Sequence, residues 1–483
     1  MHAVMALMAL YRPSALLGIL AHLLCLVQGF SDHPVLLVSL DGLSWRYTGG
    51  DLANTSNLDY IASTGVKAKW MRPIQPVKTW PIHQTYMTGL YAETHGIVSN
   101  NFWDPLFKEK FVLQYDCSNF DPKFYNSSEP LWLTVQKRGG KSGVHFWPGY
   151  YSYPEKPSYT EKPECFVDCS AIKSSDLPRY RNKTRQGWPP YIHCFANQSL
   201  PYKNRIDKIL NWMKSDDPPK FVALYVNEPD SSGHGFGLFS GHYKRAVEKM
   251  DKEVIGYLIE RLIKAELFDK VNLVVVSDHG MVSISSSRSI YLSDFVNPDT
   301  FTMSEAGVAG HLWPRDRVGL EDEIYQNLTR AAAINSHFSV IKRDDIDEKY
   351  HWKDNRRIPP IYVKTELGWT VHQIRPAVIT NYTSADHGWY PVPGQERLLG
   401  PVFFARGPAF KRDYESQNGL NVIDVYPLLC HLLGITPLPN NGSLDNMKEI
   451  LADSSLSNAM CNKIFGLCLG ICAIFVFIGL QKL

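Results

Sequence analysis

Three stretches of the chain are runs of apolar residues that end abruptly in an acidic residue: Pro34–Asp41, Phe221–Asp230 and Val271–Asp278. Short, nearly continuous apolar runs are typical of strands buried on both faces, as in parallel sheets. Two segments with helical spacing of apolar residues, Asn204–Lys214 and Tyr243–Ala265, lie between these runs. The alternation predicts an α/β fold with a doubly wound, mostly parallel sheet flanked by helices.

Two stretches interrupt this alternation and are interpreted as loop-rich insertions outside the sheet. Residues 105–203 hold four cysteines and many Tyr and Pro, and residues 284–380 include a helical segment, Leu320–Ala333, and a polar, basic run near Arg343–Arg357. A length of 483 residues would allow about three domains. Because there is no internal repeat or low-complexity tract, we instead expect one large body over residues 30–450.

The N-terminus predicts a secretory signal peptide over residues 1–29. Arg12 precedes an apolar run, Ala15–Val27, and small residues suitable for cleavage follow near Gly29. The run of about 13 residues is short for a membrane span, which favours cleavage over the alternative of an uncleaved anchor.

The C-terminus carries a second apolar segment, Ile464–Leu480, which is followed by three residues and preceded by a stalk over residues 451–463. One interpretation is a single membrane span with almost no cytoplasmic tail. The other is a glycosylphosphatidylinositol (GPI) anchor signal, in which Asp453–Ser455 would be the attachment site and Leu456–Lys463 the spacer. Either interpretation predicts a cell-surface protein with an extracellular body, as a single-pass type I membrane protein or a GPI-anchored one.

Glycosylation sequons and cysteines agree with an oxidising, extracellular compartment. The sequons are at Asn54, Asn126, Asn182, Asn197, Asn327, Asn381 and Asn441. Four of the nine cysteines cluster in the first insertion and predict two disulfides of unknown connectivity: Cys117, Cys165, Cys169 and Cys194. The spacing of Cys165 and Cys169 would also suit a metal knuckle, but no second pair follows at zinc-site spacing. The sequence does not decide whether Cys430 and Cys461 pair.

Composition narrows the functional classes. Lys and Arg total 50 against 48 Asp and Glu, and 44% of residues are hydrophobic, which is ordinary for a globular protein. The formal net charge of +2 offers no basic stripe, so we expect no nucleic-acid-binding surface. The 12 Trp, 25 Tyr and 22 Phe are compatible with an aromatic ligand cleft or with a large packed surface, and composition does not separate the two.

The acids at the strand ends are the strongest indication of chemistry. The carboxyl ends of parallel strands lie at one edge of the sheet, so Asp41, Asp230 and Asp278 should converge there. Converging carboxylates are costly without a cation. Aspartate and neutral histidine are zinc ligands. Together with nearby histidines, the acids form a candidate set of six ligands, enough for two metals: Asp41, Asp230, His234, Asp278, His279 and His387.

The candidate nucleophile is Thr79, in Lys78-Thr79-Trp80-Pro81. A threonine in this position is more commonly a helix cap. Its candidacy depends on the metal set, because a bound metal lowers the pKa of a hydroxyl group and makes it nucleophilic near neutral pH.

Several motifs, in the same order along the chain, resemble those of the ectonucleotide pyrophosphatase/phosphodiesterases, which belong to the alkaline-phosphatase-like two-zinc superfamily. The resemblance extends over residues 34–445 and is carried by Val38–Gly42, Lys78–Pro81, Thr88–Ile97, Glu228–His234, Ser277–Met281 and Asp386–Gly388. A late segment, Asp424–Gly434, is similar to that of the short membrane-tethered types 4 and 5.

The resemblance implies roles for individual residues. Asp41, Thr79, Asp278 and His279 would surround one zinc, and Asp230, His234 and His387 would hold the second. Thr79 would attack phosphorus and form a phospho-threonine intermediate, while Asn100 would donate to a phosphate oxygen. Trp80 would stack on the base, with Tyr191 or Phe195 as its partner across the base; the alternative is that Trp80 is a core residue.

The implied activity is cell-surface hydrolysis of extracellular nucleotides (dinucleoside polyphosphates, NAD, ATP or ADP) to nucleoside 5′-monophosphates. Departures from the family pattern leave the substrate open: Ser44 stands where Arg is commoner, Ile82 where Asn is, and Asp386 and Trp389 where Asn and Tyr are. The alternatives are a phospholipase C-like hydrolase of choline phosphodiesters and, in another functional class, an inactive adhesion or signalling ectodomain.

Overall fold

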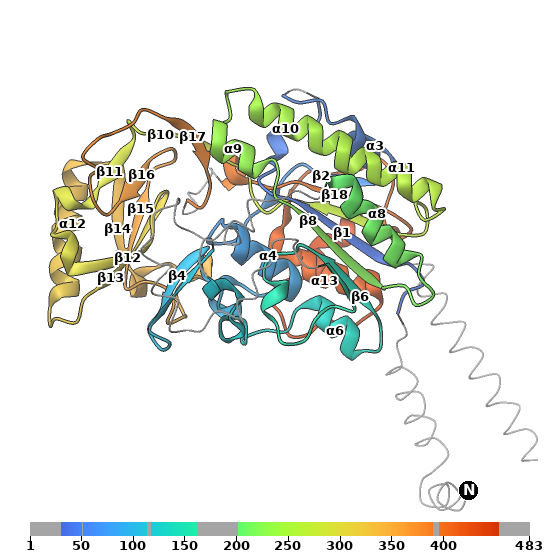
Figure 1. Cartoon of the computed structure of the whole chain (residues 1–483), viewed down its shortest axis with the longest axis horizontal. Helices are drawn as coiled ribbons and strands as arrows, with labels where there is room; N and C mark the ends of the chain where they lie inside the picture. Colours follow the sequence, from blue (N-terminus) through green and yellow to red (C-terminus); the bar gives the residue numbers. More distant parts are fainter. Residues whose placement is uncertain (1–29, 51, 114–116, 162–200, 390–395, 454–483) are drawn as a thin grey trace, which may run out of the picture.

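The computed structural model describes residues 30–50, 52–113, 117–161, 201–389 and 396–453. Its centre is an eight-stranded sheet in the order β19-β2-β18-β9-β1-β8-β6-β7 (Figure 1). The three predicted strands are confirmed as β1 (Val35–Leu40), β8 (Phe221–Val226) and β9 (Asn272–Val276). β1 lies between the other two and pairs with both in parallel.

The predicted mostly parallel character of this sheet is confirmed. β6 (Ser142–His145) pairs in parallel with β8 and with β7 (Tyr159–Thr160). Both strands lie within residues 105–203, so the prediction that this stretch is an insertion outside the sheet is wrong for them; β6 and β7 are short, four and two residues, and lack the long apolar run that identified the other strands. β18 (Phe403–Arg406) runs antiparallel to both of its neighbours, β9 and β2 (Val66–Ala68). β19 (Tyr414–Ser416) is parallel to β2, so β18 is the single reversed strand among the eight.

Helices cover both faces of the sheet because the side chains of each central strand alternate between two apolar clusters. In β1, Val35 and Leu37 belong to one cluster, and Leu36, Val38 and Leu40 belong to the other. The second cluster includes residues of α3 (Ser56–Thr64), α8 (Tyr202–Met213), α10 (His242–Met250) and α11 (Tyr257–Lys264). The first includes residues of α4 (Thr79–Thr88), α6 (Leu131–Lys137) and α13 (Val425–Leu433).

The predicted helices are also present. The expected segment 204–214 is α8, and the segment 243–265 is one helical stretch in which a π-helical turn, Asp251–Gly256, joins α10 to α11.

The second predicted insertion folds differently from the expectation. It lies outside the central sheet, as expected, but it contains a four-stranded antiparallel sheet of its own. This sheet has the order β12 (Phe301–Glu305), β13 (Ala309–Pro314), β15 (Ile361–Thr365), β14 (Phe338–Lys342), and α12 (Leu320–Ile334) packs on it. These elements form the lobe at the left of Figure 1. The sheet escaped prediction because strands such as β14 are only partly buried and carry polar residues.

Short strand pairs complete the described structure. Near the lobe lie β4 (Asn101–Asp104) with β5 (Glu109–Val112), β10 (Val282–Ser285) with β17 (Thr383–Asp386), and β11 (Ser289–Tyr291) with β16 (Thr370–His372). β3 (Met71–Arg72) pairs with β20 (Leu420–Asn421). The short helix α5 (Ala92–His95) follows α4, and the short helix α9 (Asp230–Phe236) follows β8.

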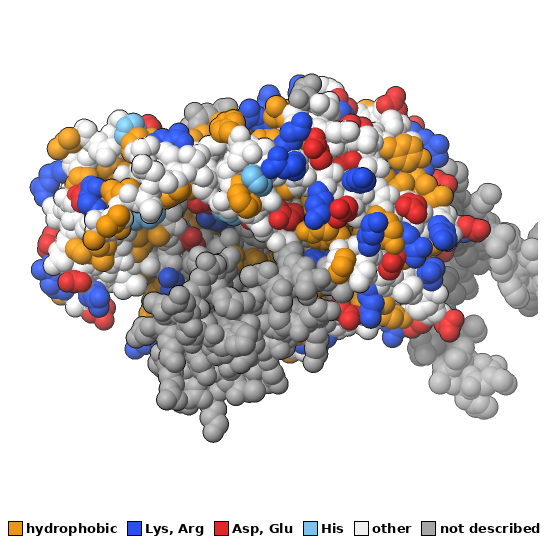
Figure 2. Space-filling model, turned by 45° about the horizontal axis from the view of Figure 1, so that its top comes forward, with side chains coloured by type: hydrophobic (Ala, Val, Ile, Leu, Met, Phe, Trp, Pro, Cys, Tyr) orange, Lys and Arg blue, Asp and Glu red, His pale blue; other side chains and the backbone are white. Residues whose placement is uncertain are grey.

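Several predictions fall on residues outside the described ones. These are the signal peptide, the anchor segment 464–480, the stacking partners Tyr191 and Phe195, and the cysteines at 165, 169, 194 and 461. Among the described helices, none combines the length and the apolar character needed to cross a membrane. Cys430 is buried in α13 and forms no disulfide with another described cysteine. On the face shown in Figure 2, Lys and Arg side chains are interspersed with Asp and Glu.

Candidate active site

The three strand-end acids meet at the carboxyl edge of the central sheet. Asp41 directly follows β1, Asp230 begins α9 after β8, and Asp278 follows β9. Two backbone hydrogen bonds connect them: the Asp230 N–H donates to the Asp41 carbonyl at 2.9 Å, and the Gly42 N–H donates to Asp278 Oδ1 at 3.0 Å. The register of three adjacent parallel strands therefore produces a compact group of carboxylates.

Gly42 is required for this close approach. Its φ of +72° is in the left-handed region, and a Cβ at this position would lie 2.8 Å from both Cα and Cβ of Asp230. Any other residue would be strained and would displace Asp230 from Asp41.

One group of candidate ligands comprises Asp41, Asp278 and His279, with Thr79 beside it. His279 Nε2 lies 3.1 Å from Asp278 Oδ2 and 3.5 Å from Asp41 Oδ1. The Thr79 hydroxyl oxygen is 3.3 Å from the same nitrogen. All four side chains are buried. The structure thus places the proposed nucleophile against the ligand set that the sequence analysis assigned to one metal.

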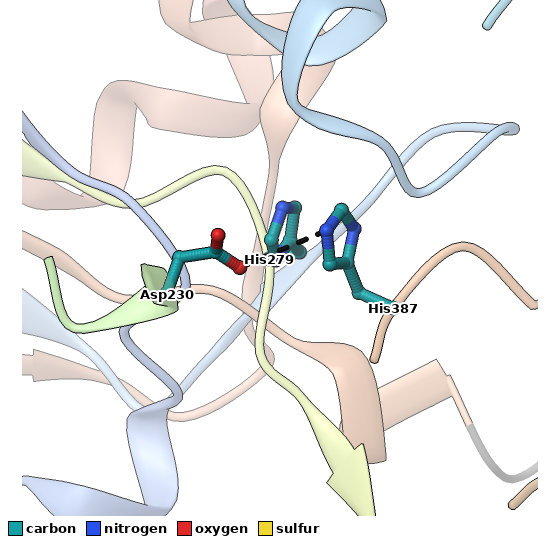
Figure 3. Close-up of side chains that lie close together, drawn as sticks. All are labelled: Asp230, His279 and His387. Atoms are coloured by element: carbon teal, nitrogen blue, oxygen red, sulfur yellow. Dashed lines mark ion pairs between the residues drawn. The ribbon is translucent and has the colours of Figure 1, made fainter. Parts of the chain in front are cut away.

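The second group is built around Asp230, whose Oδ1 lies 3.3 Å from His234 Nε2 and 3.7 Å from His387 Nε2. His387 stacks on His279 with 3.4 Å between ring centroids, so the two groups adjoin (Figure 3). His387 Nδ1 lies 3.0 Å from the Val77 carbonyl oxygen. Because a carbonyl oxygen only accepts hydrogen bonds, Nδ1 carries the proton, and Nε2 has a free lone pair that faces Asp230.

The donor set fits divalent cations. Within the described part of the chain, the buried oxygens Asp41 Oδ1, Asp230 Oδ1 and Asp278 Oδ2 accept no hydrogen bond. Burial and the neighbouring carboxylates of Asp278 and Asp230 raise the pKa of Asp41 well above its usual value. Burial also acts to raise the pKa of Asp278, but His279, His83 and the Gly42 N–H together outweigh it and the pKa is lowered. Carboxylate oxygens without hydrogen bonds beside imidazole nitrogens are the donors that zinc takes in catalytic sites.

Asp386 adds a further carboxylate, which the sequence analysis did not count among the candidate ligands. Asp386, His234 and His387 form a third cluster of potential ligand atoms. Desolvation acts to lower the pKa of His234, whose side chain is still 39% exposed, but Asp230 and Asp386 together outweigh it and raise the pKa to about 9.

Thr79 is held at the first residue of α4. The ring of His83, one turn further, contacts the Thr79 carbonyl through Nδ1 at 2.7 Å and Ser39 Oγ through Nε2 at 2.9 Å. On the other side, the Trp80 N–H donates to Asn100 Oδ1 at 2.9 Å, which leaves the Asn100 amide NH₂ as the donor. Asn100 is therefore fixed beside the nucleophile.

Trp80 lies in the hydrophobic core, with 5% of its surface exposed and its indole N–H donating to the Tyr125 hydroxyl at 3.0 Å. This environment fits the core-packing alternative, and base stacking by Trp80 stays a prediction.

Sequence reasoning missed other residues of the site. The Tyr225 hydroxyl donates to Asp41 Oδ2, and Lys78 pairs with Glu305 at 3.9 Å. Tyr225 lies within the apolar run of β8, and Glu305 within the second insertion, so neither position carries a local signal. The position of Lys78 next to Thr79 could have suggested it.

Comparisons with known proteins agree with this arrangement. The family model described as type I phosphodiesterase/nucleotide pyrophosphatase matches residues 35–390. Human ectonucleotide pyrophosphatase/phosphodiesterase family member 5 is 33% identical over 432 residues, covering 89% of this chain and 81% of that protein. The Xenopus laevis bis(5′-adenosyl)-triphosphatase is 31% identical, covering 88% and 82% of the two chains.

Solved structures give the same result. The structure of the human family member 5 covers 87% of this chain and all of its own, with a TM-score of 0.74 and 32% identity. A murine family member 5, described as inactive and in complex with AMP, matches with the same score at 31% identity. The range of the family model includes every candidate ligand from Asp41 to His387, and on these matches the chain belongs to the type I phosphodiesterase/nucleotide pyrophosphatase family of enzymes.

Proposed function

We propose that the chain is a two-zinc phosphodiesterase/pyrophosphatase that hydrolyses extracellular nucleotides to nucleoside 5′-monophosphates, with Thr79 as its nucleophile. The observation that carries the proposal is the buried position of the Thr79 hydroxyl, 3.3 Å from His279 and beside carboxylate oxygens that accept no hydrogen bond from the described residues. A hydroxyl group in such a cluster is suited to lose its proton when cations are bound.

The ligands divide into two sets. Asp41, Thr79, Asp278 and His279 would hold one zinc, and Asp230, His234 and His387 the other. Bound zinc supplies Lewis-acid charge to the phosphoryl oxygens and lowers the pKa of a hydroxyl group or water beside it.

The residues of the chain orient the substrate and supply the nucleophile. Thr79 stands at the N-terminus of the ten-residue helix α4, where the helix dipole favours an anionic phosphoryl group. The Asn100 amide, held by the Trp80 N–H, would donate to a phosphate oxygen. Thr79 Oγ1 would form a bond to phosphorus as the bond to the leaving group breaks, and water would then cleave the phospho-threonine ester and release the nucleoside 5′-monophosphate.

The names of the relatives support nucleotides as the substrate class. One relative is a bis(5′-adenosyl)-triphosphatase, and the murine structure contains AMP. Dinucleoside polyphosphates, NAD, ATP and ADP are therefore the first substrates to test.

The proposed location is the cell surface, with the body of the protein, residues 30–450, outside the cell. Among the sequons on described residues, Asn54, Asn126, Asn381 and Asn441 are exposed and Asn327 is half-buried. Release of the surface protein by a phosphatidylinositol-specific phospholipase would establish a lipid anchor, and resistance would favour a membrane span.

The deciding experiment compares hydrolysis of p-nitrophenyl thymidine monophosphate and p-nitrophenyl phosphorylcholine by the wild-type chain and two variants. We expect the wild type to prefer the first substrate and Thr79→Ala to lose turnover by at least about 10³-fold while it keeps its zinc. Thr88→Ala is the matched control, because Thr88 is a buried threonine of the same helix that donates to the Gln84 carbonyl.

Preference for the choline ester would favour the phospholipase C-like alternative. A wild type that turns over neither substrate would favour the inactive ectodomain, and full activity of Thr79→Ala would remove Thr79 from its role.

A further inference from the structure

A buried carboxylate of the second lobe reaches the flanks of the candidate nucleophile. Glu305 ends β12, next to a register shift in the pairing with β13, and its side chain is 7% exposed. Its two oxygens face different segments of the main body. Oε1 lies 3.9 Å from Lys78 Nζ, and Oε2 accepts hydrogen bonds from the loop at residues 99–101.

The contact with residues 99–101 surrounds Asn100. Ser99 Oγ, the Asn101 N–H and Asn101 Nδ2 all donate to Glu305 Oε2, at 3.1, 2.9 and 3.2 Å. Both neighbours of Asn100 are therefore bound to one carboxylate oxygen. Three donors on one oxygen suit a negatively charged acceptor.

The other contact holds Lys78, the residue before Thr79. Its side chain is 8% exposed, and a Cβ on Gly388 would lie 2.2 Å from Lys78 Cε. The aliphatic part of the Lys78 side chain thus packs closely against Gly388, which follows His387, and the Lys78 ammonium group faces Glu305. A buried ammonium group depends on such a partner, because it is costly to bury alone.

These contacts form a closed ring around the nucleophile. Glu305 contacts Lys78 on one side of Thr79. Through residues 99–101 it also reaches Asn100, whose Oδ1 accepts from the N–H of Trp80 on the other side. A displacement of Glu305 would therefore move a cation and an amide donor relative to the Thr79 hydroxyl, without contact between Glu305 and the candidate metal ligands.

We propose that Glu305 is a positioning residue for phosphoryl transfer, which holds Lys78 and Asn100 in place beside Thr79. The proposal rests on the proposed function, in which Thr79 is the nucleophile. On this proposal, the second lobe contributes to catalysis through Glu305. The proposed nucleophile, the amide donor and the zinc ligands all belong to the main body or its adjoining loops.

Two substitutions separate the two contacts. Glu305→Gln keeps the side-chain volume. If the amide oxygen faces residues 99–101, its NH₂ group is turned toward the Lys78 ammonium, so the ion pair is lost. Glu305→Ala removes both contacts. Because small displacements of catalytic groups cost up to about 10²-fold in rate, we expect each variant to lower kcat/KM by about 10- to 100-fold, mainly through kcat.

The test uses double-mutant cycles on the full chain loaded with zinc, with p-nitrophenyl thymidine monophosphate as substrate. Glu305→Gln is combined with Lys78→Met, and Glu305→Ala with Asn100→Ala. If Glu305 acts through these residues, the combined losses in kcat/KM are smaller than the product of the single losses in both cycles. Multiplicative losses in either cycle would overturn the proposal.

A stability control separates positioning from general destabilisation. Glu93 Oε2 also accepts hydrogen bonds across segments, from the N–H groups of Lys353 and Asp354 at 2.8 and 3.0 Å. Glu93→Gln should lower the melting temperature and leave kcat and the affinity for AMP, measured by calorimetry, unchanged. If the Glu305 variants show only this pattern, the proposal fails while the proposed function stands. A wild-type chain that does not hydrolyse the substrate would instead refute the proposed function.

Discussion

The buried ion pair of Asp104 with Arg357 gives the sharpest prediction for stability. Asp104 is fully buried and accepts hydrogen bonds from Arg357 Nε at 2.6 Å and from Arg356 Nη2 at 2.8 Å. Arg357 is 1% exposed, and its Nη1 donates to the carbonyls of Gly96 and Phe124 at 2.7 and 3.0 Å. The substitution Asp104→Asn keeps the shape of the acceptor but leaves the guanidinium of Arg357 buried without a counter-ion.

The expected cost follows from burial. Removal of one partner of a buried ion pair costs about 3–5 kcal/mol, because the remaining charge is uncompensated. Arg356 adds little, since its side chain is 43% exposed and solvent screens its contribution. With an unfolding entropy of about 2.1 cal/mol/K per residue over roughly 420 residues, this loss corresponds to about 3–6 °C in melting temperature.

The assay is differential scanning calorimetry at one fixed scan rate. Asp294→Asn is the matched control: Asp294 also binds an arginine, Arg375, but the two side chains are 33% and 51% exposed, and we expect a loss below about 1 kcal/mol. Burial acts to raise the pKa of Asp104, but the two arginines outweigh it, so the pKa is lowered in the folded protein. The stabilisation is then complete above the unfolded pKa of about 3.9, and it declines as the pH falls through the folded pKa.

The difference between Asp104→Asn and wild type should accordingly be constant from about pH 8 to about pH 5.5. If Asp104→Asn melts within about 1 °C of wild type, or no lower than Asp294→Asn, the reasoning from buried charge is refuted.

Three further predictions concern the candidate metal centre. Zinc binding to the chelator-treated protein should release protons at neutral pH. The reason is that burial and neighbouring acids raise the pKa of Asp41, and that Asp230 raises the pKa of His234 to about 9. A pH indicator in weak buffer measures the released protons, and zinc uptake without proton release would contradict the prediction. Elemental analysis should find two zinc ions per chain before treatment, and fewer in Asp230→Asn. Gly42→Ala should lower zinc content and activity, because the new Cβ would displace Asp230. Gly49→Ala is the control: Gly49 has a similar positive φ, but no described atom lies within 4 Å of the position of its Cβ, so the substitution should cost only local strain. Equal zinc content in the two variants would show that the close approach at Gly42 is unimportant.

The parts of the fold that could be predicted are those with a local signature. β1, β8 and β9 are buried on both faces, so their sequences are nearly continuous apolar runs, and the acids that follow them mark the edge of the sheet. β14 is only partly buried, and its sequence, Phe338-Ser-Val-Ile-Lys342, does not stand out from a loop. Composition could not predict the environment of Trp80, because the same residue type suits a ligand cleft and a core.

The residues of the candidate site likewise divide into those that have a local sequence signature and those that do not. Asp41, Asp230 and Asp278 could be found because strand register alone brings them together. The pair between Lys78 and Glu305 joins two lobes, and the hydrogen bond from Tyr225 to Asp41 comes from within a core strand, so both depend on side-chain packing that no local pattern encodes.

The position of β18 in the central sheet has a consequence for the order of synthesis. β18 comes from residues 403–406, yet it lies between β2 and β9, two strands that leave the ribosome much earlier. His387 is also synthesised late, although it stacks on His279 and contacts the carbonyl of Val77, which lies 310 residues earlier in the chain. The nascent chain therefore contains its three strand-end acids before it contains the histidine and the strand that complete their surroundings. A metal held through His387, as proposed above, could be bound only after that residue has been made.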